Sequence, residues 1–305
     1  MSKPVAPVVA LPPELVRSLS QRSTWRGALQ LAVHLGSLML SGVALWALWG
    51  TLWMVPLWLI TGVLWNYLYA AQHELSHGTV FRSRKANEWW GRVIGFTQLY
   101  PRDYDRHHHM RHHRHTGDPD HDAELAFRTP YTLASYMMYV LGPSYWWGRV
   151  RAITAVALGR FDAYPMPPSA SQRLALESRA HALLYGAIAV ASVATGFIWI
   201  AALWLGPMLT TKWAHQLQNT VEHTGRPMVP DLLESTRTVK APWLWRQLVW
   251  NMTYHTAHHS FPSVPFHRLP ELHDHMLERG VTPSMSTYLG FQREVLARLA
   301  RGYTV

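Results

Sequence analysis

No charged residue interrupts the chain from Gly27 to His73. At 1.5 Å per residue, this stretch would make about 70 Å of helix, enough for two crossings of a ~30 Å hydrocarbon core with a turn between them. The turn is expected near Trp49 to Thr51 or at Pro56. Because the turn carries no charge, it favours the non-cytoplasmic side of a membrane.

A second apolar block runs from Ala180 to Thr211. Its length of about 48 Å is too short for two crossings unless the last helix continues past Lys212 toward His223. We expect it to do so, with the Lys212 side chain reaching back to the membrane interface. The segment 129–148 is also uncharged, but it is rich in Tyr and Trp and is interrupted by Gly142 and Pro143, so we expect it to lie in the interface.

These blocks predict an all-α integral membrane protein whose four transmembrane helices form two hairpins. A third crossing between residues 114 and 222 would place the polar segments before and after it on opposite sides of the membrane. Two hairpins keep these segments on one side. Basic residues before and after the first hairpin predict that this side is cytoplasmic. We expect one domain over residues 1–305, with a cytosolic segment 1–26 and spans near 28–48, 52–72, 181–199 and 202–222.

Composition agrees with a membrane location, because 49% of the residues are hydrophobic and only 15% are charged. The absence of cysteine excludes a disulfide framework and a thiolate metal site. The formal net charge of +10 suits nucleic acid, anionic lipid or an acidic protein as a partner. Nucleic acid is the weakest of these, because the basic residues are scattered among the spans and form no recognised module.

Histidine spacing is the strongest chemical signal in the chain. Residues four apart on a helix share one face, as do residues three apart, so imidazoles at these spacings can reach one metal ion. The sequence holds such spacings at the ends of the apolar blocks and between them, in His73 and His77, in His109, His112 and His113, in Asn219 and His223, and in His255, His258 and His259. The run from 107 to 115 leaves the register of the second group ambiguous.

A single histidine pair at this spacing is more often a surface or core feature than a metal site. Nine imidazoles in four clusters beside a membrane reverse that balance. Nine ligands exceed the four to six that one ion takes, so the count predicts two metal ions. Imidazole suits iron, zinc, copper and nickel alike, and the spacing does not choose among them.

The same segments resemble the membrane fatty acid desaturase superfamily, whose boxes read HxxxH, HxxHH and HxxHH. The matching stretches are HELSHGTVF at 73–81, HMRHHRHTGDPD at 109–120, NTVEH at 219–223 and YHTAHHSFPSVPFHRLPELH at 254–273. The resemblance implies four membrane helices under a cytosolic helical cap that holds a non-haem di-iron centre. It also implies oxidation of an unactivated C–H bond with O₂ as co-substrate.

Carried over residue by residue, the resemblance implies nine iron ligands, with Asn219 holding a metal-bound water and His107, His108 and His115 as bystanders. The nine are His73, His77, His109, His112, His113, His223, His255, His258 and His259. Neighbouring groups should orient the rings by hydrogen bonds. Candidates for that role are Glu74, Asp118, Asp120, Glu222 and Asn251.

We therefore expect O₂-dependent desaturation of a long-chain acyl or other lipid substrate, on the cytoplasmic face of an inner or plasma membrane in a bacterium. The cycle needs two electrons from outside, and the chain has neither a GxGxxG fingerprint nor an HPGG haem motif, so a separate donor is implied. A basic face with Arg102, Arg106, Arg111 and Arg114 would suit an acidic, ferredoxin-like donor. The substrate-binding residues are not identified.

Two alternatives remain. A hydroxylase or ketolase acting on a lipid or carotenoid-like substrate would share the histidine boxes, because the first hydrogen abstraction is common to these reactions. A His-rich membrane metal transporter would need ionisable residues along a path within the spans. The apolar blocks offer only His34 and His181 for such a path.

Overall fold

The computed structural model describes residues 9–122, 124, 130–161 and 168–305. It is mostly helical, as the sequence predicts. In chain order the elements are α1 (Pro13–Leu19), α2 (Thr24–Ala47), α3 (Met54–His77), α4 (Arg84–Thr97), α5 (Arg102–His115), α6 (Leu133–Leu141), α7 (Pro143–Ala157), α8 (Pro168–Thr195), the π-helical η1 (Ala201–Leu205), α9 (Gly206–Thr210), α10 (Lys212–His223), α11 (Leu232–Ser235), β1 (Thr238–Lys240), α12 (Trp243–Leu248), the 3₁₀ turn η2 (Met252–Tyr254), α13 (His255–Ser260), the 3₁₀ turn η3 (Phe266–Arg268), α14 (Leu269–Glu278), β2 (Met285–Thr287) and α15 (Tyr288–Ala300).

The first hairpin is formed by α2 and α3, which pack against each other along the first apolar block. Among the described helices, these two alone are long and apolar enough to cross a membrane, with mean hydropathies of 1.6 and 1.3. The turn between them contains Gly50 at a positive φ of 82°, close to where the sequence places it. Helix α3 continues to His77 and ends at Gly78, whose left-handed conformation suits a residue without a Cβ. The helix therefore reaches beyond the expected span and carries the first histidine pair.

The second apolar block is less regular than the first. Helix α8 begins at Pro168, well before the expected span, and the return segment is divided into η1, α9 and α10. Pro207 stands at the start of α9, where its missing N–H is tolerated, and the helix breaks at Thr211. Lys212 does not reach the interface as expected, because it is buried, with Nζ 3.9 Å from the centre of the Tyr145 ring.

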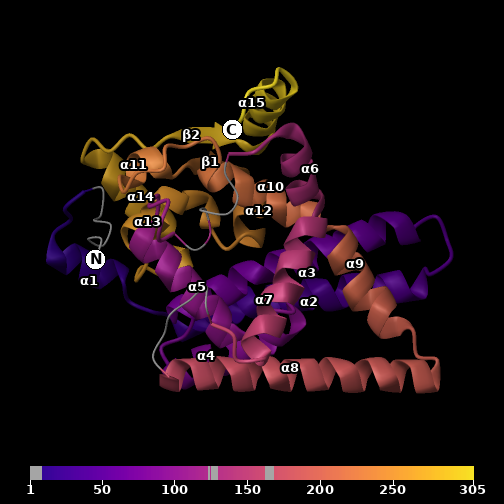
Figure 1. The fold of residues 1–305 in the computed structure, drawn as a ribbon. Coiled ribbons are helices and arrows are strands. Elements are labelled where there is room, and N and C mark those ends of the chain that lie inside the picture. Colours follow the sequence, from indigo (N-terminus) through magenta and orange to yellow (C-terminus); the bar gives the residue numbers. More distant parts are fainter. Residues whose placement is uncertain (1–8, 123, 125–129, 162–167) are drawn as a thin grey trace.

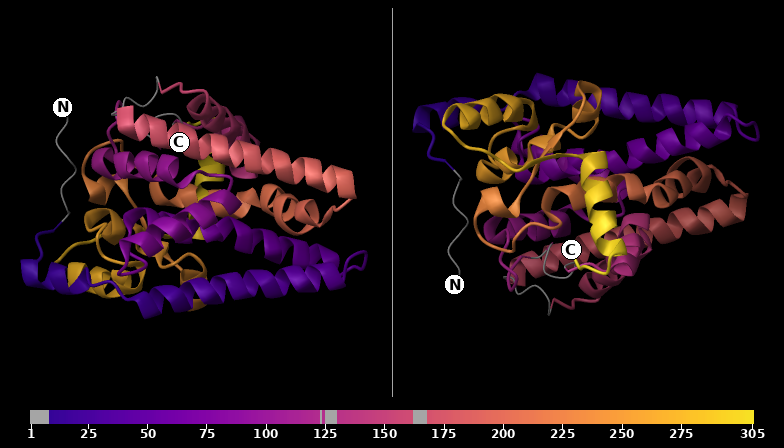
Figure 2. Two further views of the ribbon diagram at one scale, coloured as in Figure 1. Left: turned by 90° about the horizontal axis from the view of Figure 1, so that it is seen from below. Right: turned by 90° about the horizontal axis from the view of Figure 1, so that it is seen from above.

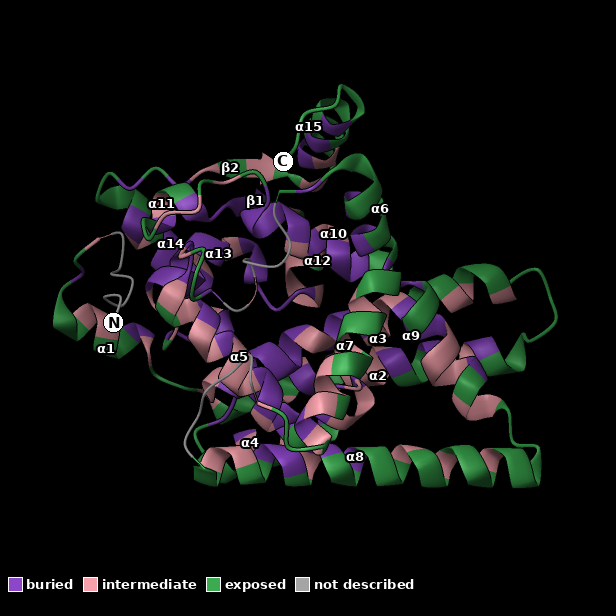
Figure 3. Ribbon diagram, in the orientation of Figure 1, coloured by how far each residue is buried: buried purple, intermediate pink, exposed green. Residues whose placement is uncertain are grey.

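Figures 1 and 2 show how the two apolar blocks are arranged. Helices α2 and α3 lie beside α8 and α9, and the turns that join the members of each pair lie at the same end of the molecule. Most of α8 is coloured as exposed in Figure 3. The exposed residues include large apolar ones, such as Leu183 and Val193 on α8. Exposed apolar surface of this extent is typical of a face that contacts lipid. Gly142 and Pro143 separate α6 from α7, and neither of these helices reaches 18 residues.

The rest of the molecule includes a cap formed by α5, α10 and the elements from α11 to α15. In Figure 1, α5, α11, α13 and α14 lie at the end away from the turns, and α15 lies above the middle of the hairpins. The cap contains a two-stranded parallel sheet in which Thr238, Val239 and Lys240 pair with Met285, Ser286 and Thr287. This short sheet is the departure from the all-α expectation. A buried apolar cluster joins the cap to the first hairpin through Leu75 of α3, Ala257 of α13 and Leu272 of α14. The packing fixes the last turns of α3 against the cap.

Candidate metal centre

Helices α3, α5 and α13 carry the three histidine boxes. His73 and His77 lie on the last turns of α3, and α5 presents His109, His112 and His113. The short helix α13 consists largely of the third box, His255–Ser260, and follows a turn in which Asn251 has a positive φ of 58°. His223 is the last residue of α10. The structure therefore brings together segments up to 186 residues apart in the sequence, between His73 and His259.

The nine histidines form two adjoining groups. One ring nitrogen from each of five residues lies within 4.8 Å of the others, and three more residues form a second such set. The first group contains His73, His77, His109, His113 and His258, and the second contains His112, His223 and His259. His255 joins the second group, because its Nε2 lies 2.7 Å from Nε2 of His223. All nine predicted residues are thus brought together.

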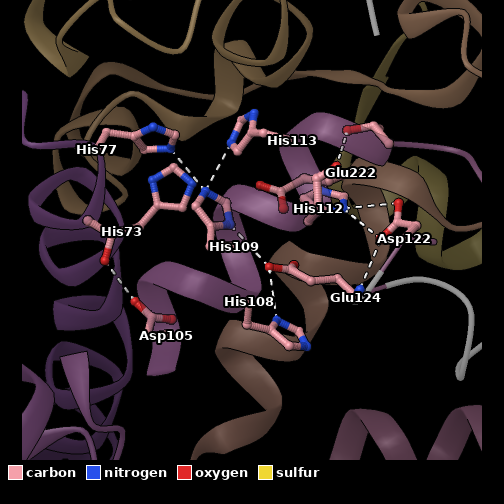
Figure 4. Close-up of polar contacts among 12 residues, drawn as sticks. His73, His77, Asp105, His108, His109, His112, His113, Asp122, Glu124 and Glu222 are labelled. Carbon is pink, nitrogen blue, oxygen red and sulfur yellow. Dashed lines mark hydrogen bonds and ion pairs between the residues drawn. The ribbon is translucent and has the colours of Figure 1, made fainter. Parts of the chain in front are cut away.

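The nitrogens of the first group converge closely (Figure 4). Nε2 of His109 lies 3.0 Å from Nε2 of His77 and 2.9 Å from Nε2 of His113. Nε2 of His113 lies 3.1 Å from Nε2 of His258. Two nitrogens bound to one metal at ~2.1 Å and at right angles would be about 3 Å apart, so the spacing matches that of neighbouring ligands.

Hydrogen bonds at Nδ1 determine which nitrogen can bind a metal. His109 Nδ1 lies 3.1 Å from Oε1 of Glu124, and His112 Nδ1 lies 2.9 Å from Oδ1 of Asp122. His223 Nδ1 lies 2.9 Å from the carbonyl oxygen of Ser235. A carboxylate and a carbonyl only accept hydrogen bonds, so Nδ1 of each ring carries the proton and Nε2 keeps its lone pair.

His259 has the same tautomer by a less direct route. The Thr116 hydroxyl donates to the carbonyl oxygen of His112 at 2.8 Å, which uses its hydrogen. Its oxygen therefore accepts from Nδ1 of His259, 3.1 Å away. Nε2 of His259 is left buried without a hydrogen-bond partner among the described residues. A buried lone pair of this kind is costly unless a metal or a proton donor occupies it.

The donor set fits a metal site. Nε2 of His109 has one lone pair, yet both His77 and His113 place a nitrogen at hydrogen-bonding distance from it. One lone pair cannot accept both hydrogen bonds at good geometry, whereas a metal ion between the rings would use all three nitrogens. Burial and neighbouring imidazoles lower the pKa of His113, His258 and His259 well below its ordinary value. These rings are therefore neutral at pH 7, as metal binding requires.

Asp122 and Glu124 orient two of the rings, and the sequence analysis did not select them. Burial alone would raise the pKa of Glu124. The opposing effect of His112, His108 and His109 is larger, so the pKa of Glu124 lies well below its usual range. Asp122 behaves in the same way through burial and its contact with His112. Both groups are therefore ionised acceptors. Both carboxylates lie in the loop that follows the second box. The chain reverses its direction at Gly117, which has a φ of 75°, and this reversal brings the two side chains back to α5.

The carboxylates chosen from the sequence lie in different places. Glu74 is buried, and its Oε1 lies 3.8 Å from Nδ1 of His73 and 4.0 Å from Nδ1 of His258. Glu222 has Oε1 3.6 Å from Nδ1 of His255. These two residues are therefore beside the histidines.

The other three candidates do not contact the histidine groups. Asp118 pairs with His121 at 3.0 Å, and Asp120 is exposed. The Asn251 amide donates to the carbonyl oxygen of Phe266. Asp118 stabilises the loop after α5 through His121 and the backbone N–H of Asp120, whereas Asn251 holds the turn before α13.

The remaining histidines near the cap are placed differently from one another. His108 lies 3.6 Å from Glu124 and therefore shares the carboxylate that orients His109. His115 stacks on His121 with ring centres 5.3 Å apart, outside both groups. His107 is half-buried and belongs to neither group.

The histidines in the apolar blocks have structural partners. His34 contacts the carbonyl oxygen of Leu64 through Nε2 and accepts from Trp250 through Nδ1. His181 Nδ1 lies 3.2 Å from the hydroxyl of Tyr185. These bonds give both residues a role in helix packing and do not support a metal path through the spans.

A cavity of about 70 Å³ lies against both histidine groups. His73 and His109 line it from the first group, and His112, His223 and His255 line it from the second. The Asn219 side chain also lines the cavity, one helical turn before His223. The space is large enough for several water-sized groups.

Three of the four arginines expected to form a basic face make contacts within the protein. Arg102 is buried and pairs with Asp103, and Arg106 donates to the carbonyl oxygen of Ser76. Arg111 donates to the carbonyl oxygen of His121, whereas Arg114 is exposed. These four residues therefore do not form one exposed basic patch.

Comparison with known proteins gives a consistent result. The family model described as fatty acid desaturase matches residues 51–287, which is more than half of the chain. The sn-1 oleoyl-lipid 12-desaturase of Anabaena variabilis is 22% identical over 89% of this chain and 67% of its own length. The sphingolipid delta(4)-desaturase of Drosophila melanogaster is 27% identical over 69% of this chain and 62% of its own length. The chain thus spans about two thirds of the length of these two relatives.

Proposed function

The chain belongs to the fatty acid desaturase family, and on that basis we propose that it desaturates a long-chain lipid with O₂ at a histidine-bound di-iron centre. Family membership makes the chain an oxidoreductase that acts on lipids. The observation that carries the finer proposal is the convergence of nine imidazoles in two groups, with four rings fixed so that Nε2 is unprotonated. Two groups of nitrogen ligands suit two metal ions.

In this proposal, His73, His77, His109, His113 and His258 hold one iron, and His112, His223, His255 and His259 hold the other. When bound, the irons would supply the oxidation of an unactivated C–H bond with O₂. Glu124 and Asp122 keep the proton on Nδ1 of His109 and His112, which leaves Nε2 free. Asn219 holds a water in the cavity beside both groups. Most of the nine histidines are buried, which limits the access of bulk water to their nitrogens.

Electron balance requires a separate donor. Two hydrogens leave the substrate with two electrons, and two further electrons and two protons complete the reduction of O₂ to two waters. The chain has no flavin, nicotinamide or fused haem motif that would supply the second pair. A ferredoxin-like protein on the cytoplasmic side is the proposed donor.

The proposed membrane arrangement has four crossings with the histidine site on the cytoplasmic side. Support comes from the two apolar helices α2 and α3, from the exposed apolar side chains of α8, and from the parallel course of the two hairpins (Figure 2). The histidines lie at the end of the hairpins away from the uncharged turn. That turn would face the non-cytoplasmic side.

The test compares His258→Ala with His181→Ala in a host of defined lipid composition. We expect His258→Ala to abolish turnover, because His258 lies in the first histidine group, and His181→Ala to retain most of it, because His181 contacts Tyr185 away from that group. Lipid and pigment profiles by mass spectrometry give the readout. A product lighter by two hydrogens supports desaturation, whereas an added oxygen would establish the hydroxylase or ketolase alternative.

Equal losses in both variants would indicate a folding defect instead of metal chemistry. Iron content of each purified variant separates these cases. A variant that keeps its helical content but loses iron has lost a ligand. Full activity of His258→Ala would contradict the proposed ligand set.

A further inference from the structure

The cavity beside the histidines is lined by polar and aromatic side chains. Its lining residues are His, Tyr, Glu, Asn and Arg, and no aliphatic side chain appears among them. A pocket built to hold methylenes from the middle of an acyl chain is normally lined by apolar side chains. This wall therefore suits a part of the substrate that carries oxygen.

Arg149 supplies the positive charge of the wall. Its guanidinium lies 3.0 Å from the centre of the Tyr100 ring and 4.7 Å from the centre of the Tyr145 ring. Nη2 donates to the Tyr145 hydroxyl, whereas Nη1 is buried with no hydrogen-bond partner in the described part of the chain. A buried charged donor without an acceptor is costly. The guanidinium is thus positioned by two aromatic rings, and one of its donor nitrogens lacks an acceptor among the described residues.

The carboxylate of Asp105, which acts electrostatically on Arg149, does not complete the pairing. Asp105 accepts hydrogen bonds of 3.0 Å from Tyr69 and from Ser76. No carboxylate of the described residues lies within ion-pair distance of Arg149. Lys212 adds a second cation against the same Tyr145 ring, and its Nζ lies 3.1 Å from His215, which lines the cavity. The positive electrostatic potential from Arg149 and Lys212 on this side of the cavity favours an oxygen acceptor.

We propose that the guanidinium of Arg149, a residue that lines the cavity, binds an acyl oxygen of the substrate, either a carboxylate or an ester or amide carbonyl. The cavity of about 70 Å³ has room for only a few water-sized groups, so the bound oxygen and the reacting carbon share one small space. The oxidised bond then lies within a few carbons of the polar end of the lipid. This inference rests on the proposed function and specifies the substrate and the position attacked.

Ligand binding tests the inference without turnover. The iron-loaded protein in nanodiscs is offered radiolabelled palmitate, methyl palmitate and hexadecane, with affinities expressed per mole fraction of ligand in the bilayer. We expect the two ligands with an acyl oxygen to bind at least tenfold more tightly than hexadecane. A preference for palmitate over the ester would identify a carboxylate, and equal binding of the two would identify a carbonyl.

The variants are Arg149→Met, Arg149→Lys and the control Arg151→Met, an exposed residue on the same helix. Arg149→Met should remove the tenfold preference, Arg149→Lys should keep part of it, and Arg151→Met should keep all of it. Iron content and the unfolding midpoint of each variant report folding. If Arg149→Met does not fold, Arg149→Lys and the ranking of the three ligands by the wild type decide the question.

Equal binding of the three ligands by the wild type, or an unchanged preference in Arg149→Met, would overturn the inference. So would a product oxidised in the middle of the chain. These results would leave the proposed function intact, because the protein would still bind iron and oxidise a lipid. A protein that takes up no iron and forms no lipid product would instead contradict the proposed function.

Discussion

At the scale of single residues, the site depends on the groups behind the histidines as much as on the histidines. Helical spacing is visible in a sequence and indicated the four clusters, whereas the resemblance to the desaturase family was needed to select the nine histidines, because spacing left the register within 107–115 open. Asp122 and Glu124 could not be selected in the same way, because they reach α5 only after the chain reverses at Gly117. Asp118, which stands nearer to the box, pairs with His121 instead. A carboxylate a few residues after a histidine box was the available signal, but spacing alone did not show which one turns inward.

Asp122→Asn should weaken metal binding by about 10- to 100-fold, the usual effect of losing a group that orients a ligand. Asp122 accepts from His112, from Gly117 N–H and from Glu124 N–H. An amide in either orientation would turn its NH₂ group toward at least one of these donors. Competition with a chelator measures the affinity.

Asp118→Asn is the matched control, since Asp118 lies in the same loop and contacts His121. It should leave metal affinity unchanged. Equal affinity of the Asp122 and Asp118 variants would show that Asp122 does not orient a metal ligand.

At the scale of helices, the first apolar block forms two regular helices, whereas the second is divided into several. The α2–α3 hairpin follows the uncharged stretch closely, because uninterrupted apolar sequence specifies a long helix. The return segment is broken at Thr211 and contains Pro207, and Lys212 points into the protein toward Tyr145. Charge and length could not predict this, because the position of Lys212 depends on packing against α7, which is distant in the sequence.

Gly62→Ala should destabilise the protein by about 1–3 kcal/mol, the usual cost of overpacking. A Cβ at Gly62 would clash with the carbonyl oxygen of Pro207 and the side chain of Thr211, so α3 and α9 could not approach as closely. Gly36→Ala is the control, because a Cβ there would meet no atom within 4 Å. Thermal unfolding in detergent compares the two, and a Gly62→Ala protein as stable as Gly36→Ala would contradict close packing of α3 on α9.

At the scale of the whole molecule, the apolar hairpins place the histidine-bearing ends of α3, α5, α10 and α13 together in the cap. The sequence predicted a mostly helical protein with clustered histidines, and both features are confirmed. The small parallel sheet was not predicted, since its two strands are three residues each and pair across a long separation. The cavity and the position of Arg149 in its wall could not be predicted from the sequence either, because both depend on contacts between separate helices.

The absence of cysteine makes the membrane arrangement directly testable. A single cysteine at Leu52, which is 92% exposed in the turn of the first hairpin, should react with an impermeant maleimide from the non-cytoplasmic side of intact cells. A cysteine at Lys85, an exposed residue near the start of α4, should react only after the cells are opened. Labelling of both positions from the same side would contradict the two-hairpin arrangement.

Metal content per chain tests the central claim most directly. Purified protein, reconstituted with ferrous iron and freed of excess metal, should contain two irons per chain by mass spectrometry, with nitrogen ligands at about 2.1 Å by X-ray absorption. We expect two irons per chain because the imidazoles converge in two groups. Protein that retains no iron, or only one iron per chain at saturation, would contradict the account.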